Sequence, residues 1–177
     1  MPRVGLISDT HGLLRPEAVA FLRGSDCIVH AGDVGDAEVI ERLRELAPVT
    51  AVRGNNDNGA WAEALAESEV VRVDRVAIHV LHDIAHLAVD PAAAGFDVVV
   101  FGHSHRPSSE MRGGVLYVNP GSAGRRRFRL PISVCELQIA GNSVVSRHVE
   151  LSPASCTTRS MPSSLPLGKG LGTYVSP

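Results

Sequence analysis

Residues 98–105, where an apolar run ends in two histidines, say more about the fold of this chain than any other stretch. Residues 98–101 are Val-Val-Val-Phe, a pattern typical of a strand that is buried on both faces. Gly102 lets the chain turn away from the sheet, and His103 and His105 follow. Open α/β sheets bind their ligands at the carboxyl ends of strands, and imidazole is a common metal ligand. The stretch therefore favours an α/β fold with a metal site at a strand end.

The same design occurs several more times in the chain. Apolar runs cover residues 3–7, 27–29, 49–52 and 76–81. Metal-ligating side chains follow these runs in the order Asp9 and His11, Asp33, Asn55, and His82. Oxygen and nitrogen ligands of these types suit divalent ions such as Mn²⁺, Fe²⁺, Ni²⁺ or Zn²⁺, and the absence of cysteine ligands argues against a structural zinc site. With His103 and His105 the set is too large for one ion with an open position, so it predicts two ions that share one carboxylate.

The order of the elements predicts an α/β protein with two packed, mixed β-sheets flanked by helices. Helical patterns over 16–22 and 36–46 alternate with the first strands, which indicates parallel pairing. Two hairpins over 110–118 and 132–149 follow, which indicates antiparallel pairing. We expect one domain over residues 1–152 and a flexible tail over 153–177, because the tail is rich in Ser, Pro and Gly and has few apolar residues.

Composition narrows the classes of partner. A net charge of -2 gives no field that attracts nucleic acid or a membrane, and an aromatic content of 4% disfavours a platform for stacking bases. No apolar run reaches transmembrane length, and we expect no signal peptide. Cys27, Cys135 and Cys156 are widely spaced, which favours a reducing compartment and predicts a cytoplasmic protein.

Taken together, the motifs resemble the calcineurin-like metallophosphoesterase superfamily, and within it the small single-domain phosphodiesterases of bacteria and archaea. The motifs that carry the resemblance are Asp9-x-His11, Gly32-Asp33, Gly54-Asn55-x-Asp57, His82 and Gly102-His103-x-His105. The resemblance spans roughly residues 3–150 and implies the four-layer sandwich of that family. It also implies a ligand assignment. Asp9, His11 and His105 hold one metal, Asn55, His82 and His103 hold the other, and Asp33 bridges both together with a water or hydroxide.

The function implied by the resemblance is that of a phosphodiesterase in which a metal-bound hydroxide attacks phosphorus. Manganese is the favoured metal, with Ni, Fe, Zn or Mg as alternatives. The expected substrate is a small phosphodiester or nucleotide, and formation of a homo-oligomer is left open. Two other functions remain as alternatives: a non-enzymatic scaffold of the same fold, and a nuclease. The complete set of competent ligands disfavours the first, and the charge and aromatic content disfavour the second.

Two residues, Asn56 and Asp57, are candidates for catalysis, and two more are candidates for binding the substrate. Arg125, in the basic run over 125–129, and Arg53 are candidates for binding phosphate, with a solvated loop as the alternative for the run. Asn56 and Asp57 occupy the position where phosphatases of the superfamily commonly have a histidine paired with an aspartate. A carboxamide does not titrate in the useful range, so Asn56 is expected to donate a hydrogen bond to a phosphoryl oxygen or the leaving group. This predicts a preference for activated aryl diesters.

Other polar residues receive weaker predictions. Asp83 stands where the small phosphodiesterases commonly have glycine, so it either orients a ligand histidine or narrows the substrate pocket. His30 is expected to pack or hydrogen-bond below the site. His79 and His148 are expected in structural or surface positions, and His86 is expected at the surface, with the pocket as the alternative.

Overall fold

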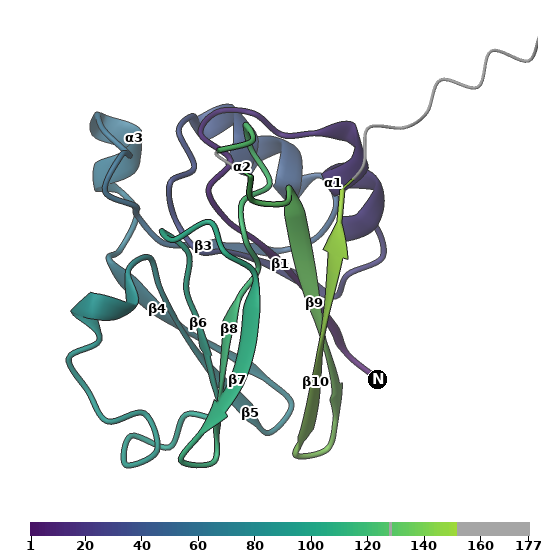
Figure 1. The fold of residues 1–177 in the computed structure, drawn as a ribbon, viewed down its shortest axis with the longest axis vertical. Coiled ribbons are helices and arrows are strands. Elements are labelled where there is room, and N and C mark those ends of the chain that lie inside the picture. The colour runs from purple at the N-terminus through teal and green to yellow at the C-terminus, as the bar shows by residue number, and fades with distance from the viewer. Residues whose placement is uncertain (128, 152–177) are drawn as a thin grey trace, which may run out of the picture.

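A computed structural model of the chain describes residues 1–127 and 129–151 (Figure 1). The strands form two five-stranded sheets. The first sheet has the order β10 (Ser143–Glu150), β9 (Ser133–Ala140), β1 (Arg3–Ile7), β2 (Cys27–His30) and β3 (Val49–Ala51). The second has the order β4 (Ser68–Val73), β5 (Val76–Leu81), β6 (Val98–Val100), β8 (Val115–Asn119) and β7 (Ser108–Arg112). The helical elements are α1 (Pro16–Leu22), α2 (Ala37–Arg44), α3 (Ala60–Glu63) and the 3₁₀ turn η1 (Ile84–His86). The predicted fold class is confirmed.

Both sheets are mixed, and each contains three neighbouring parallel strands. In the first sheet these are β1, β2 and β3, while β9 pairs antiparallel with β1 and β10 pairs antiparallel with β9. In the second, β5, β6 and β8 are parallel, with β4 and β7 as antiparallel edges. Parallel neighbours in one sheet deliver the loops after them to the same edge, which is the condition for gathering ligands there.

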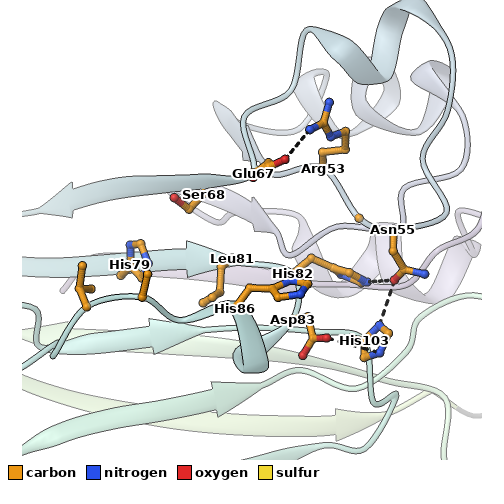
Figure 2. A pocket seen from close by; sticks show the side chains of 13 residues that line it. Arg53, Asn55, Glu67, Ser68, His79, Leu81, His82, Asp83, His86 and His103 are labelled. Atoms are coloured by element: carbon orange, nitrogen blue, oxygen red, sulfur yellow. Dashed lines mark hydrogen bonds and ion pairs between the residues drawn. The ribbon is translucent and has the colours of Figure 1, made fainter.

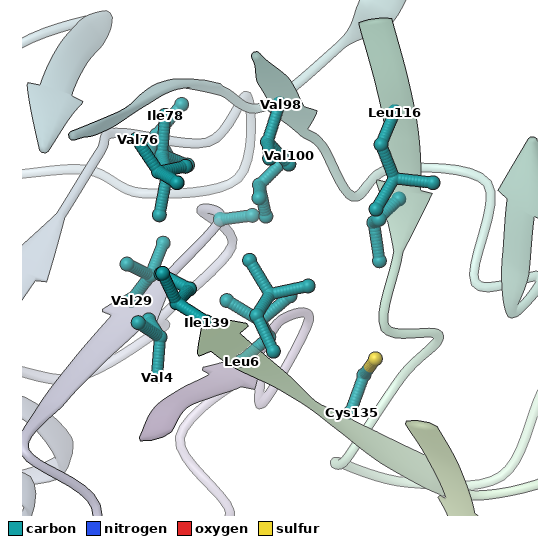
Figure 3. Close-up of a cluster of buried hydrophobic side chains, with 14 of the residues drawn as sticks. Val4, Leu6, Val29, Val76, Ile78, Val98, Val100, Leu116, Cys135 and Ile139 are labelled. Atoms are coloured by element: carbon teal, nitrogen blue, oxygen red, sulfur yellow. The ribbon is translucent and has the colours of Figure 1, made fainter. Parts of the chain in front are cut away.

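The main core lies between the two sheets (Figure 3). Leu6 of β1 and Val29 of β2 face Ile78 of β5 and Val100 of β6, and all four are completely buried. Successive side chains of a strand point to opposite faces, so Ile7 points away from this core and toward the helices. Strands with apolar residues on both faces thus join two cores, as the uninterrupted apolar runs in the sequence predict.

The helices α1 and α2 cover the outer face of the first sheet. Leu22 of α1 and Ile40 and Leu43 of α2 pack in one cluster with Ile28 of β2. Asp36 caps the second helix, because its side chain accepts the Glu38 N–H at 2.9 Å. These helices therefore fix the loops that leave β1 and β2.

The outer face of the second sheet has only a thin cover. Leu81, Val99 and Val115 pack against the side chains of Ile84 and Leu87, in and just after η1. Residues 91–95, between η1 and β6, form a run of hydrogen-bonded turns rather than a helix. The stretch is short and cannot sustain helix nucleation without a packed apolar face.

None of the described helices is long and apolar enough to cross a membrane. The predicted domain boundary at residue 152 and the predicted flexible tail over 153–177 fall outside the described residues, so both stay predictions.

Candidate metal centre

The seven predicted ligands lie on loops that follow parallel strands of both sheets. The loops after β1, β2 and β3 carry Asp9, His11, Asp33 and Asn55. The loops after β5 and β6 carry His82, His103 and His105. Contacts between loops of the two sheets bring these side chains into two neighbouring groups.

The first group consists of Asp9, His11 and His105, whose ligand atoms all lie within 4.8 Å of one another. Nε2 of His105 is 3.2 Å from Oδ1 of Asp9 and 3.4 Å from Nε2 of His11. Oδ1 of Asp9 is buried and receives no hydrogen bond, whereas Oδ2 accepts one from the Ser8 hydroxyl at 2.6 Å. A buried carboxylate oxygen without a donor is costly, and a divalent ion held by these three side chains would satisfy it.

The second group surrounds Oδ1 of Asn55, which is 3.0 Å from Nε2 of His82 and 3.0 Å from Nδ1 of His103 (Figure 2). Nδ1 of His82 lies 2.7 Å from the carbonyl oxygen of Ala31. Because a carbonyl only accepts, this contact places the proton of a neutral His82 ring on Nδ1 and leaves a lone pair on Nε2. An imidazole lone pair and a carboxamide oxygen that face each other fit a cation between them, so these residues suit a second ion.

Asp33 lies between the two groups. Its Oδ1 is 3.4 Å from Nε2 of His82, and its Oδ2 is 3.8 Å from Nε2 of His11. The ligand atoms of Asp9, Asp33 and His82 also lie within 4.8 Å of one another, so the two groups are contiguous. A carboxylate with one oxygen toward each group has the geometry that a ligand shared by two ions needs.

The backbone is left-handed at five of the seven candidate ligands. Six described residues other than glycine have a positive φ, and one of them, Asp74, lies in the turn between β4 and β5. The other five have φ between 47° and 66° and are Asp9, His11, Asp33, His103 and His105. This conformation costs of order 1–3 kcal/mol for each residue and gathers at functional sites. The strain therefore supports the candidate site independently of side-chain chemistry.

Two glycines of the motifs allow the ligand loops to approach one another closely. A Cβ added to Gly32 would lie 2.6 Å from Nδ1 of His82, and one added to Gly102 would lie 2.8 Å from Oδ2 of Asp9. Both distances are too short for a real side chain. The glycines next to Asp33 and His103 are therefore required by the packing of the site.

Electrostatics keep a negative charge at the centre of the site. Burial raises the pKa of Asp33, but hydrogen bonds from the charged form of His82 and from Asn56 outweigh it and hold the pKa well below its ordinary value. Burial lowers the pKa of His82, but its contacts with Asp33 and the Ala31 carbonyl outweigh it and raise the pKa overall. Burial lowers the pKa of His11. An ionised carboxylate among histidines is prepared to meet a cation.

The two predicted catalytic residues contact the ligand loops. The backbone N–H of Asn56 donates to Oδ1 of Asp33 at 2.8 Å, and its Nδ2 donates to Oδ2 at 2.6 Å. The buried carboxylate of Asp57 accepts the backbone N–H groups of Gly35 and Gly54 at 2.7 Å and 2.8 Å. Asn56 and Asp57 thus hold the site together, and their catalytic roles stay predictions.

The two arginines predicted to bind phosphate lie in different places. Arg53 is at the edge of a cleft beside the second group, and its Nη2 is 2.7 Å from Oε1 of Glu67 (Figure 2). Arg125 is exposed and is not among the described residues that line this cleft. Arg53 therefore lies beside the candidate centre and Arg125 is exposed, and phosphate binding by either stays a prediction.

The cleft has a volume of about 730 Å³. The metal-ligand candidates Asn55, His82 and His103 form one wall. His79, which we expected in a structural or surface position, lines the cleft and stacks on Phe96 with ring centroids 4.8 Å apart. His86 also lines it, which was the alternative to its expected surface position. His79 and Leu81 are two residues apart on β5, so their side chains point to the same face of the sheet. This spacing is the signal that could have placed His79 in the cleft. Asp83 lines the cleft and also approaches His103.

Comparison with known proteins gives the family. A model described as "Calcineurin-like phosphoesterase superfamily domain" matches residues 3–142. The chain belongs to the calcineurin-like phosphoesterase superfamily. It is 35% identical to a Methanocaldococcus jannaschii protein named "Probable metallophosphoesterase", over 67% of this chain and 67% of that protein. It is 34% identical to the phosphodiesterase YfcE of Escherichia coli, over 69% of this chain and 79% of YfcE.

Solved structures agree with this family. The structure of YfcE, a phosphoesterase from E. coli, has a TM-score of 0.62 and 26% identity, and covers 85% of this chain and all (100%) of that chain. Wild-type Vps29 of Entamoeba histolytica, in complex with zinc, has a TM-score of 0.66 and 24% identity, over 84% and 98% of the two chains. At that identity Vps29 shares the fold alone. The fold by itself therefore does not separate an enzyme from a scaffold. That choice depends on the side chains of this calcineurin-like phosphoesterase that could hold divalent metal.

Proposed function

We propose that this calcineurin-like phosphoesterase is a dinuclear, metal-dependent phosphodiesterase that hydrolyses small phosphodiesters. The observation that supports it most is the position of the Asp33 carboxylate, with one oxygen toward His82 and the other toward His11. In this proposal the first ion is held by Asp9, His11 and His105, the second by Asn55, His82 and His103, and Asp33 is shared.

A pair of divalent ions, when bound, supplies a nucleophile that ionises near neutral pH and neutralises charge on the phosphoryl oxygens. Manganese is the metal we favour, because the proposed ligands combine carboxylate, carboxamide and imidazole without thiolate. Nickel, iron, zinc and magnesium fit the same ligand chemistry. Two such ions, two aspartates and one hydroxide sum to about +1 with neutral histidines, which suits an anionic diester.

The cleft of about 730 Å³ beside the second group is proposed to take one arm of the diester, with Arg53 at its edge. Neither Asn56 nor Asp57 is well placed to protonate a leaving alkoxide. A carboxamide does not titrate, and the Asp57 carboxylate already accepts two N–H groups. We therefore expect activated aryl diesters to react faster than esters with poor leaving groups.

A complete set of seven ligand-type side chains supports the enzyme over a scaffold. The net charge of -2 and the aromatic content of 4% support a small substrate over nucleic acid. Cys27 and Cys135 are free thiols, which supports the proposed cytoplasmic location.

Hydrolysis of a chromogenic aryl phosphodiester tests the proposal. The protein is stripped with chelator, reloaded with Mn²⁺ and compared with a His103→Ala variant, while a plasmid-nicking assay runs in parallel. Metal-loaded wild type should hydrolyse the ester with two ions bound by elemental analysis, and His103→Ala should lose most of this activity. Nicking of the plasmid without hydrolysis of the ester, or no hydrolysis with any of the five metals, would overturn the proposal.

A further inference from the structure

The carboxamide of Asn56 is bonded to a candidate metal ligand. Its Nδ2 donates to Oδ2 of Asp33 at 2.6 Å, and the backbone N–H of the same residue donates to Oδ1 at 2.8 Å. The described lining of the cleft does not include Asn56. The contact expected from the sequence, with a phosphoryl oxygen or the leaving group, stays a prediction, and the carboxamide in this structure is directed at Asp33.

Two donors on one residue fix both oxygens of the Asp33 carboxylate. The terminal torsion of an aspartate is broad, so an unsupported carboxylate rotates easily. At Asp33 such rotation would move Oδ1 away from His82 and Oδ2 away from His11. A carboxylate held at both oxygens keeps one oxygen directed at each ligand group.

The loop that carries Asn56 is itself anchored. Asp57 accepts N–H groups from Gly35 and Gly54, which ties residues 54–57 to the loop after β2. A Cβ at Gly54 would lie 2.1 Å from the backbone nitrogen of Asp33, so the two loops are in close contact. Nδ2 of Asn58 donates to the Asn56 carbonyl at 2.8 Å, a backbone contact that does not involve the Asn56 carboxamide and is not part of this anchoring. The Asn56 side chain therefore approaches Asp33 from a fixed support.

We propose that Asn56 is a positioning residue that holds Asp33 as a bridge between the two metal ions. The inference rests on the proposed function, because a shared carboxylate matters only where two ions bind. Changes to groups that orient a metal ligand commonly weaken metal binding by 10–100-fold. Loss of the Asn56 side chain should therefore weaken the binding of the ion pair, and should reduce hydrolysis equally for good and poor leaving groups.

The test compares Asn56→Ala with Asn58→Ala. Both residues are exposed and lie in the same loop, so each truncation removes one carboxamide without opening a cavity in the core. Mn²⁺ affinity and stoichiometry are measured by calorimetric titration of chelator-stripped protein. Electron paramagnetic resonance then reports whether bound Mn²⁺ ions are magnetically coupled as a pair. Melting of the metal-free proteins and a series of aryl diesters that differ in leaving-group pKa complete the comparison.

We expect wild type and Asn58→Ala to bind a coupled pair with the same affinity. Asn56→Ala should bind Mn²⁺ about 10–100-fold more weakly, lose the coupled signal at limiting metal, and melt as wild type does when metal-free. Its kcat/KM at limiting metal should fall by one factor across the whole substrate series.

Three results would overturn the inference. One is unchanged affinity and coupling in Asn56→Ala while wild type binds two ions, which leaves the proposed function intact. Another is a loss that grows with leaving-group pKa, which would assign Asn56 to the leaving group. The last is a drop in metal-free melting large enough to make Asn56 a folding residue. A wild-type protein that never binds a second ion would instead remove the proposed function together with this inference.

Discussion

Oδ2 of Asp83 lies 3.7 Å from Nε2 of His103, on the side of the imidazole opposite to the nitrogen that faces Asn55. Oδ1 of the same carboxylate accepts the N–H of Ala85 at 2.9 Å and so begins η1. Of the two roles considered for this aspartate, the contact with His103 favours the orienting role, and its place in the cleft wall is compatible with the other. A carboxylate at Nε2 favours a proton there and keeps Nδ1 free to bind metal.

We predict that Asp83→Asn weakens Mn²⁺ binding about 10-fold, because the variant keeps the η1 cap but loses the charge beside His103. Asp90→Asn is the matched control, since Asp90 caps the next turn through the Ala92 N–H at 3.0 Å and has no described contact with a candidate ligand. Calorimetric titration measures both. Equal affinities in the two variants would show that Asp83 does not act on His103.

Substitution of the shared carboxylate should have the largest effect. Asp33→Asn removes the charge between the two ligand groups, so we expect the loss of at least one ion and of about 10²-fold or more in rate. Asp36→Asn serves as control, because Asp36 is on the same loop and an asparagine there still caps α2. Elemental analysis and aryl diester hydrolysis check the outcome. Retention of two ions at a near wild-type rate would exclude Asp33 as the bridge.

Metal removal should lower both activity and stability. Chelation is expected to abolish hydrolysis, and Mn²⁺ or Ni²⁺ should restore it. An ion that binds only the native state at 100 times its Kd stabilises that state by about 2.7 kcal/mol, so the melting temperature should rise with metal concentration. Calorimetric melting with and without Mn²⁺ measures this shift. Full activity in a sample shown by elemental analysis to be metal-free would contradict the prediction.

The buried side chain of His30 should make the protein less stable in acid. Its side chain is completely buried, with Nε2 2.9 Å from the hydroxyl of Thr10, and burial lowers its pKa from 6.5 to about 4. Between these values the unfolded chain binds a proton that the native state does not, so stability falls as pH decreases through this window. The contribution of His30 to this loss is about 3 kcal/mol.

Urea unfolding of the metal-free protein at pH 7 and pH 4 tests this prediction. The decrease in stability should be about 3 kcal/mol larger in wild type than in His30→Gln, which cannot titrate. Equal decreases in the two proteins would mean that His30 is not neutral in the native state at low pH.

Much of this fold is predictable because the signals are local. The valines of β6 are apolar on both faces, and His103 follows within a few residues, so strand and ligand are both visible in a short window. The pairing of β9 with β1 is different, because it joins Arg3 to Gln138, which are far apart in the sequence. No local pattern encodes which strand becomes a neighbour, since that choice depends on the burial of all the apolar faces together.

The candidate site shows the same division. Ligand types and spacing indicate a metal centre, whereas the contacts of Asn56 and Asp57 depend on how the loops after β2 and β3 lie against each other. The position of His86 in the cleft depends on the path of the chain around η1, which short sequence patterns do not specify. These details depend on how the loops pack against one another, which short sequence patterns indicate less well than they indicate strands and ligand types.

The division of the ligands between the two sheets has a consequence for the lifetime of the folded state. His11 and His105 belong to loops of different sheets, as do Asn55 and His82. An ion held by either pair would connect the two sheets at one edge of the core that lies between them. If unfolding begins with separation of the sheets, the bonds between the ion and the ligands of one sheet must break first. Metal release then becomes a required step of unfolding. Bound metal would then slow unfolding itself, in addition to shifting its equilibrium.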